Sequence, residues 1–229
     1  VAQVRGSVEE EFVSQMEELR AADEAVSNEP TSAPQTQREL DALPPDERKE
    51  WRMQDDAEMG KLEANKTFGD SADLGTKPFL PMHLVRKVKR TKVKKSRGVV
   101  GGHLQKEGTH FDLHSSPAAS WTGVRTSLAL IAMLCLSAML IDFESAYTQS
   151  VLPVAERVWL RMPKPYRTYR KDSSGRMIEQ LRLLIRSLYG LKQAGLLWNK
   201  LLNEFLTGFG FKRCFADYCI YILVRGTAT

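Results

Sequence analysis

The feature that most constrains this chain is a run of apolar residues that leads into an acidic residue. Residues 128–140 read LALIAMLCLSAML, and Asp142 follows two positions later. A helix that crosses a membrane needs about 20 apolar residues, so this shorter run predicts a segment buried in a protein core. We expect a helix over residues 122–134 and then a buried central strand over residues 136–143.

Asp142 itself allows two interpretations. An acidic residue at the end of a strand commonly caps the next element, and it can equally be an acid positioned for chemistry. Two features favour chemistry: the pair Ala146 and Tyr147 follows after one turn, and a loop rich in Gly and Gln, SLYGLKQAG, lies downstream. A carboxylate near phosphate-binding cations is suited to hold a divalent metal ion against a phosphate.

Charge is unevenly distributed along the chain. The net charge is +5 and the isoelectric point is about 9.1. Residues 1–30 contain eight acidic residues and two arginines, whereas residues 86–97, RKVKRTKVKKSR, contain eight basic residues and no acid. This asymmetry indicates an acidic tail and a basic contact surface of the kind that binds nucleic acid.

The first part of the chain differs in composition from the rest. Residues 1–45 are rich in acidic, Pro, Ser, Thr and Gln residues and contain little apolar surface. We predict a disordered acidic and Pro-rich linker there, and one folded domain over residues 46–229. Asp46 is the expected cap of a helix whose apolar residues recur at helical spacing: Trp51, Met59 and Leu62.

The predicted domain mixes helices and strands in irregular order. Alternating apolar and basic residues over residues 84–100 predict a hairpin that turns near Thr91 and Lys92. Helical spacing predicts a helix over residues 193–207 that ends near Gly208. Further strands are predicted over residues 158–162, 180–185 and 218–224. This order indicates an α+β fold.

Cysteine usage and the first residues bear on the compartment. Cys135, Cys214 and Cys219 have neither metal-ligand spacing nor a disulfide framework, which indicates core packing in a reducing compartment. The acidic start lacks the apolar stretch of a signal peptide, and the first residue is not Met. We expect an intracellular piece of a polyprotein that is not secreted and does not contact a membrane.

Three stretches resemble the reverse transcriptase of Ty1/copia-type retrotransposons. They are VRKVKRTKVKKSRGVVGGHLQKEGTHF, IDFESAYTQSVL, and SLYGLKQAGLLWNKLLNEFLTGFGFKRCFADYCIYI. The resemblance covers residues 46–221. It implies an α+β fold consisting of the fingers and palm of a right-hand polymerase, incomplete in this chain, and an RNA-directed DNA polymerase activity.

The resemblance also implies a catalytic centre. Asp142 matches the first catalytic aspartate, a ligand of both metal ions, and the backbone carbonyl of Phe143 matches a ligand of one of them. The implied reaction is attack of a primer 3′-hydroxyl on an α-phosphate, assisted by two Mg²⁺ ions about 3.5–4 Å apart.

Nucleotide and nucleic-acid contacts are implied in the same way. Tyr147 matches the aromatic residue that lies under the incoming sugar and excludes a 2′-hydroxyl. Lys95 and Arg97 match the cations that hold the triphosphate, and Gln193 matches a glutamine that lines the nucleotide site. The charge of the hairpin itself indicates a phosphate-contacting surface, and a charged strand edge that resists aggregation is the alternative. The hairpin residues expected to contact nucleic acid are Arg86, Lys87, Lys89, Arg90, Lys92 and Lys94. The expected partners are an RNA or DNA template–primer, deoxynucleoside triphosphates (dNTPs) and the remainder of a Gag-Pol type polyprotein, in the cytoplasm, a virus-like particle or the nucleus.

One expected motif is absent from the sequence. The family has an aromatic-x-Asp-Asp hairpin after the strand predicted at residues 218–224, but this chain continues LVRGTAT, and its pair Asp55 and Asp56 lies in the N-terminal helix. We therefore expect this truncated chain not to polymerise DNA. A non-catalytic nucleic-acid-binding remnant of a degenerate element, and a chain that fails to fold, are the alternatives.

Overall fold

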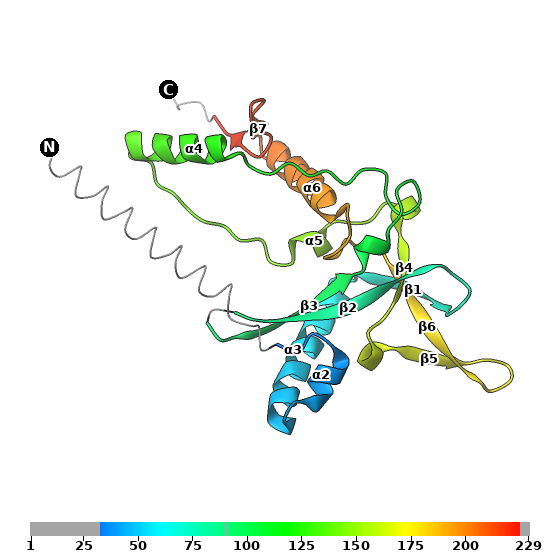
Figure 1. Ribbon diagram of the computed structural model, residues 1–229. Coiled ribbons are helices and arrows are strands. Elements are labelled where there is room, and N and C mark those ends of the chain that lie inside the picture. Colours follow the sequence, from blue (N-terminus) through cyan, green and yellow to red (C-terminus); the bar gives the residue numbers. More distant parts are fainter. Residues whose placement is uncertain (1–32, 90, 225–229) are drawn as a thin grey trace. The chain divides into compact units, whose positions relative to one another are not determined.

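The computed structural model describes residues 33–89 and 91–224, and it shows a mixed α/β chain (Figure 1). The chain divides into two compact units. The first comprises Val1–Asp55 and Val85–Ser96, and the second comprises Asp56–Leu84 and Arg97–Thr229. Helix α3 (Pro45–Ala64) and strands β2 (Phe79–Val88) and β3 (Lys94–Val100) have residues in both units.

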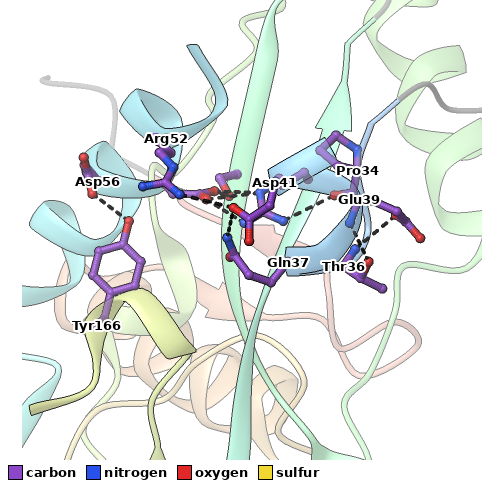
Figure 2. A network of polar contacts seen from close by, with 11 residues as sticks. Pro34, Thr36, Gln37, Glu39, Asp41, Arg52, Asp56 and Tyr166 are labelled. Carbon is purple, nitrogen blue, oxygen red and sulfur yellow. Dashed lines mark hydrogen bonds and ion pairs between the residues drawn. The ribbon is translucent and has the colours of Figure 1, made fainter. Parts of the chain in front are cut away.

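Among the described residues, the first helix of the first unit is α2 (Gln37–Ala42), which lies in the segment predicted to be a linker. Thr36 caps this helix by accepting the N–H of Glu39, whose carboxylate accepts the N–H of Thr36 in return (Figure 2). Leu40 is buried against Trp51. The helix forms because its cap is satisfied and one apolar residue reaches a core. Residues 1–32 lie outside the described residues, so the domain boundary at residue 45 stays a prediction.

A buried ion pair joins the hairpin of the first unit to α3. Arg86 on β2 and Asp55 on α3 have side chains 4% and 3% exposed, and their Nη2 and Oδ2 atoms are 2.6 Å apart. Ser96 on β3 donates its hydroxyl to the same carboxylate, and Pro34 offers its carbonyl to the guanidinium. Buried charges of this kind are tolerated because each has a partner and further hydrogen bonds.

The second unit is built on a twisted sheet. Strands β1 (Phe68–Asp73), β6 (Met177–Leu184), β4 (Val158–Arg161), β2 and β3 follow one another in that order, and β5 (Thr168–Lys171) pairs with β6. Strand β4 runs parallel to β2 and antiparallel to β6. The core consists of apolar residues from these strands, α3 and the following loops, including Leu62, Met82, Leu160, Leu184 and Leu188.

Two longer helices and a small sheet complete the second unit. They are α4 (Trp121–Met133), α6 (Ala194–Gly208), and β7 (Lys212–Arg213) paired with β8 (Tyr221–Ile222). Asp217 fixes the start of α4 by accepting the N–H and the hydroxyl of Ser120, each at 2.8 Å. The N–H of Cys219 and these two bonds lower the pKa of Asp217. Short helices fill the connections: η1 (Gly102–Leu104), α5 (Ala146–Gln149), η2 (Val154–Glu156) and η3 (Lys164–Tyr166).

Several sequence predictions are confirmed. The hairpin forms, with Lys92 in the left-handed region at φ 58° in its turn. Strands β4 and β6 and helices α4 and α6 lie where their patterns predicted them. Helix α3 begins one residue earlier than expected, at Pro45, so Asp46 lies in its first turn and is not its cap.

The prediction for the apolar run is wrong in two respects. Helix α4 has no buried residue, and residues 136–143 form neither helix nor strand, with Met139 and Leu140 83% and 96% exposed. The strand predicted over residues 218–224 is shorter in the structure, where it is β8 (Tyr221–Ile222). A central strand needs neighbours for its backbone groups, and among the described residues no strand pairs with residues 136–143.

Cys135, expected in a core, is exposed. Over the described part of the chain, helices fall short of the length and apolar content that a membrane crossing requires.

We predict that Asp55→Ala lowers the free energy of unfolding by about 3–5 kcal/mol, because it leaves the Arg86 guanidinium buried without a carboxylate. Asp41→Ala is the matched control, since Asp41 forms an exposed pair with Arg52 (Figure 2); it is expected to change stability by about 1 kcal/mol or less. Urea unfolding followed by tryptophan fluorescence measures both. Equal effects of the two substitutions would contradict the structural role of the buried pair.

Candidate functional site

The segment that carries Asp142 leaves the exposed stretch and turns into helix α5. Asp142 and Phe143 are exposed, and Ser145 takes a left-handed conformation at φ 52° just before the helix. Thr148 is buried and donates its hydroxyl to the carbonyl of Ser145, which closes the turn. Asp142 therefore lies near the end of the irregular segment over residues 136–143, just before the short helix α5 (Ala146–Gln149).

Three contacts within the second unit anchor this turn. The rings of Phe143 and Trp198 on α6 are 5.3 Å apart in an edge-on arrangement. Glu144 pairs with Lys61 on α3 at 2.6 Å, and this hydrogen bond and charge raise the pKa of Lys61. The third contact is the hydrogen bond from the Asn65 amide to the hydroxyl of Thr148, at 3.0 Å. Helices α3 and α6 thus hold the residues on either side of the turn.

An aromatic and cationic cluster forms beside α5. The rings of Tyr147 and Tyr189 meet edge-on with centroids 4.9 Å apart, and the guanidinium of Arg97 lies 5.1 Å from the centroid of Tyr189. Arg97 is exposed, whereas both tyrosines are half-buried. Here the structure brings together two predicted nucleotide residues, Arg97 and Tyr147, through a third residue.

Tyr189 was not among the residues predicted from the sequence. It belongs to the quoted stretch SLYGLKQAG and directly precedes Gly190, which takes a left-handed conformation at φ 91°. An aromatic residue next to a glycine in a loop is a signal of close backbone approach, and that signal could have identified the position.

Gln193, predicted to line the nucleotide site, is buried in this structure. It is 1% exposed, and its amide bonds to Gln105, to Glu156 and to the carbonyl of His110. Both amide hydrogens and one lone pair of the oxygen of Gln193 are thus engaged by protein groups in this structure. Its place in a nucleotide site stays a prediction.

The basic hairpin residues of the first unit divide into two groups. Lys87, Lys89 and Lys92 are exposed, and Lys95 is half-buried. Two others differ from the prediction: Arg86 is enclosed in its ion pair, and Lys94 bonds to Glu50 at 2.7 Å and lies over the ring of Trp51. Strand alternation explains the division, because successive side chains point to opposite faces and one face of the hairpin packs on α3. Arg90 lies outside the described residues.

The described residues contain no cluster of three or more His, Cys, Asp or Glu side chains that could hold a metal ion. For the predicted metal ligands, Asp142 supplies a carboxylate and Phe143 a backbone carbonyl. These are hard oxygen donors of the type that Mg²⁺ prefers.

Comparison with known proteins decides the family. A profile of the reverse transcriptase (RNA-dependent DNA polymerase) family matches residues 75–229, more than half of the chain. The chain belongs to the reverse transcriptase family. Over 127 residues, or 56% of this chain, it is 32% identical to the retrovirus-related Pol polyprotein from transposon TNT 1-94 of Nicotiana tabacum. These matches confirm the resemblance to Ty1/copia-type reverse transcriptases.

The aligned part spans 9% of that tobacco polyprotein. No solved structure matches the chain. The residues that the family profile matches include Asp142, Tyr147 and the loop that carries Tyr189.

We predict that Phe143→Ala loosens the turn that carries Asp142, because it removes the ring contact with Trp198; an aromatic pair contributes about 0.5–1.5 kcal/mol. Hydrogen exchange of the amides of Thr148 and Ser150, which bond to the carbonyls of Ser145 and Tyr147, should become faster. Phe215→Ala is the matched control, since Phe215 is 91% exposed, and it should leave these amides unchanged. Unchanged exchange in Phe143→Ala would contradict the anchoring role of the ring pair.

Proposed function

We propose that this chain is part of the fingers and palm of an RNA-directed DNA polymerase encoded in a copia-type Pol polyprotein. The observation that carries the proposal is the cluster of Arg97, Tyr147 and Tyr189, in which three separate stretches of the family match meet within the second unit. An exposed arginine suits the phosphates of a nucleotide, and an adjacent aromatic ring suits its sugar and base.

In this proposal different residues of the chain bind different parts of the nucleotide. Arg97, with Lys95, holds the triphosphate by charge and hydrogen bonds. Tyr147 lies under the sugar and excludes a 2′-hydroxyl by contact. Asp142 stands next to α5 on the same segment as Tyr147, so that its position follows the position of the ring. The partners are an RNA or DNA template–primer, dNTPs and the remainder of a Gag-Pol type polyprotein, inside the cell.

The described residues do not fit a complete two-metal centre. Asp142 and Phe143 offer one carboxylate and one carbonyl, and the described residues hold no cluster of three acidic, His or Cys side chains around them. Two divalent ions a few ångströms apart repel each other strongly, and one carboxylate leaves most of their charge uncompensated. We propose that the 229-residue polypeptide does not extend a primer by itself.

Primer extension on an RNA template with Mg²⁺ and dNTPs tests this. We expect no extension by the purified chain, and the same result for Asp142→Asn. A gel shift on the same template–primer shows that the protein used is folded and competent to bind. Extension that Asp142→Asn abolishes would show that a further carboxylate completes the centre and would overturn the proposed inactivity.

The first unit supports nucleic-acid binding without catalysis as a second function. The face of its hairpin that does not pack on α3 presents Lys87 and Lys89, and Lys92 projects from the turn. Phosphate contacts by lysine release counterions, which makes the affinity fall as salt rises. A basic face of this kind binds the backbone of a template–primer without reading its sequence.

We predict that the triple substitution Lys87→Gln, Lys89→Gln and Lys92→Gln weakens template–primer binding and reduces its salt dependence. Each lost phosphate contact removes about 0.9 from the slope of log affinity against log salt, so the slope should fall by about two to three. Gel shifts or anisotropy at several salt concentrations measure this.

The matched control changes the same number of exposed lysines in the second unit: Lys77→Gln, Lys164→Gln and Lys171→Gln. The net charge of the two triple variants is equal, so a general effect of charge would reduce the slope equally in both. Such equality would contradict a specific role of the hairpin.

A further inference from the structure

Gln105 and Gln193 form a buried pair that we call the glutamine clasp. They are 5% and 1% exposed, and Nε2 of Gln105 donates to Oε1 of Gln193 at 3.0 Å. Gln105 also accepts the backbone N–H of Lys192 at 2.8 Å. The two residues come from stretches 88 positions apart in the sequence, GGHLQKEG and SLYGLKQA.

The remaining groups of Gln193 extend the clasp to two further segments. Its amide donates to the carbonyl of His110 at 3.0 Å and to Oε2 of Glu156, the last residue of η2, at 3.2 Å. Both amide hydrogens and one side of the oxygen are therefore used. Removing the partner of a buried amide destabilises the protein by more than the bond contributes in net terms. The observed arrangement of these hydrogen bonds is therefore strongly favoured over arrangements that break them.

The clasp closes one end of a loop whose other end is tied to β3. The N–H of Val100 donates to the carbonyl of Tyr189 at 2.8 Å, and Val99 forms a parallel bridge with Tyr189. The loop over residues 188–193 is thus held at Tyr189 by backbone bonds and at Gln193 by side-chain bonds. At the first of these points the Tyr189 ring lies against Tyr147 and under Arg97.

We propose that Gln105 and Gln193 are positioning residues that hold the Tyr189 ring, and through it Arg97 and Tyr147, in the arrangement that receives a nucleotide. Both glutamines are buried in this structure, and their hydrogen bonds are made to protein groups. A binding site loses affinity when its supporting residues allow its contact groups to move, and the clasp limits that movement. The benefit to nucleotide binding rests on the proposed function; the effect on the Tyr189 ring does not.

The test compares Gln105→Met and Gln193→Met with Gln180→Met. Methionine keeps the length of the side chain and removes its hydrogen bonds. Gln180 is the matched control because it is buried in the same unit and donates to Asp73 at 2.6 Å on β1, as part of the sheet. The measurements are thermal unfolding, NMR spectra of ¹³C-labelled tyrosine rings, with the Tyr189 signal identified by Tyr189→Phe, and the affinity for deoxythymidine triphosphate.

We expect both clasp substitutions to shift the Tyr189 ring signal. They should weaken triphosphate binding about fivefold, a change of the size that one neutral hydrogen bond contributes, because the lost bonds act on binding only through the position of the ring. Gln180→Met should reduce thermal stability similarly and leave both readouts unchanged. An unchanged Tyr189 signal in the clasp variants, or an equal shift in Gln180→Met, would overturn the proposal.

Two further outcomes are separated by design. If the unsubstituted chain itself does not bind the triphosphate, the proposed function fails, whereas the ring signal still decides the role of the clasp. If a methionine variant does not fold, Gln105→Asn takes its place, because it shortens the side chain by one methylene and keeps the amide. It should shift the Tyr189 signal while the chain stays folded, and an unshifted signal would count against the clasp.

Discussion

The close approach of two backbone segments in the second unit controls the geometry of the candidate site. Gly190 has φ 91°, and a Cβ atom on it would overlap the carbonyl oxygen of Val100; a Cβ atom on Gly102 would overlap the carbonyl oxygen of Gly190. Only glycine fits at both positions, since one requires a left-handed backbone and both lack space for a side chain. This contact brings the loop of Tyr189 to the end of β3, and the positions of Arg97, Tyr147 and the glutamine clasp depend on it.

Both units use buried polar groups to define one arrangement of their segments. In the first unit Asp55 joins Arg86 and Ser96, and in the second Gln193 joins Gln105 and Glu156. Apolar contacts have no preferred direction and therefore tolerate small shifts of the groups in contact. Buried hydrogen bonds require a defined distance and angle, so they do not tolerate such shifts. The two networks also explain why Arg86 and Gln193, which the family resemblance placed at binding surfaces, are enclosed by protein.

The exposed apolar segment around Asp142 is the largest departure from the sequence prediction. Residues 136–143 have the composition of a central strand, but strand formation depends on hydrogen-bonding neighbours that composition does not reveal. Among the described residues such neighbours are absent, and the contacts near the end of the segment are those of Phe143 with Trp198 and of Glu144 with Lys61. The carboxylate of Asp142 is therefore positioned by the turn into α5 and not by a sheet.

The sequence by itself determined the local elements and the family. Periodicity located the hairpin, β4, β6, α4 and α6, because these patterns depend on which neighbours along the chain share a face. The motifs around Asp142, Tyr147 and the SLYGLKQA loop identified a reverse transcriptase. Only the tertiary structure decided which of the described cations are exposed and which are in buried ion pairs. It also decided that Gln193 is buried and that Tyr189 contacts both Arg97 and Tyr147. These outcomes depend on contacts between residues far apart in the chain. Such contacts leave no local periodicity or motif in a single sequence from which they could be predicted.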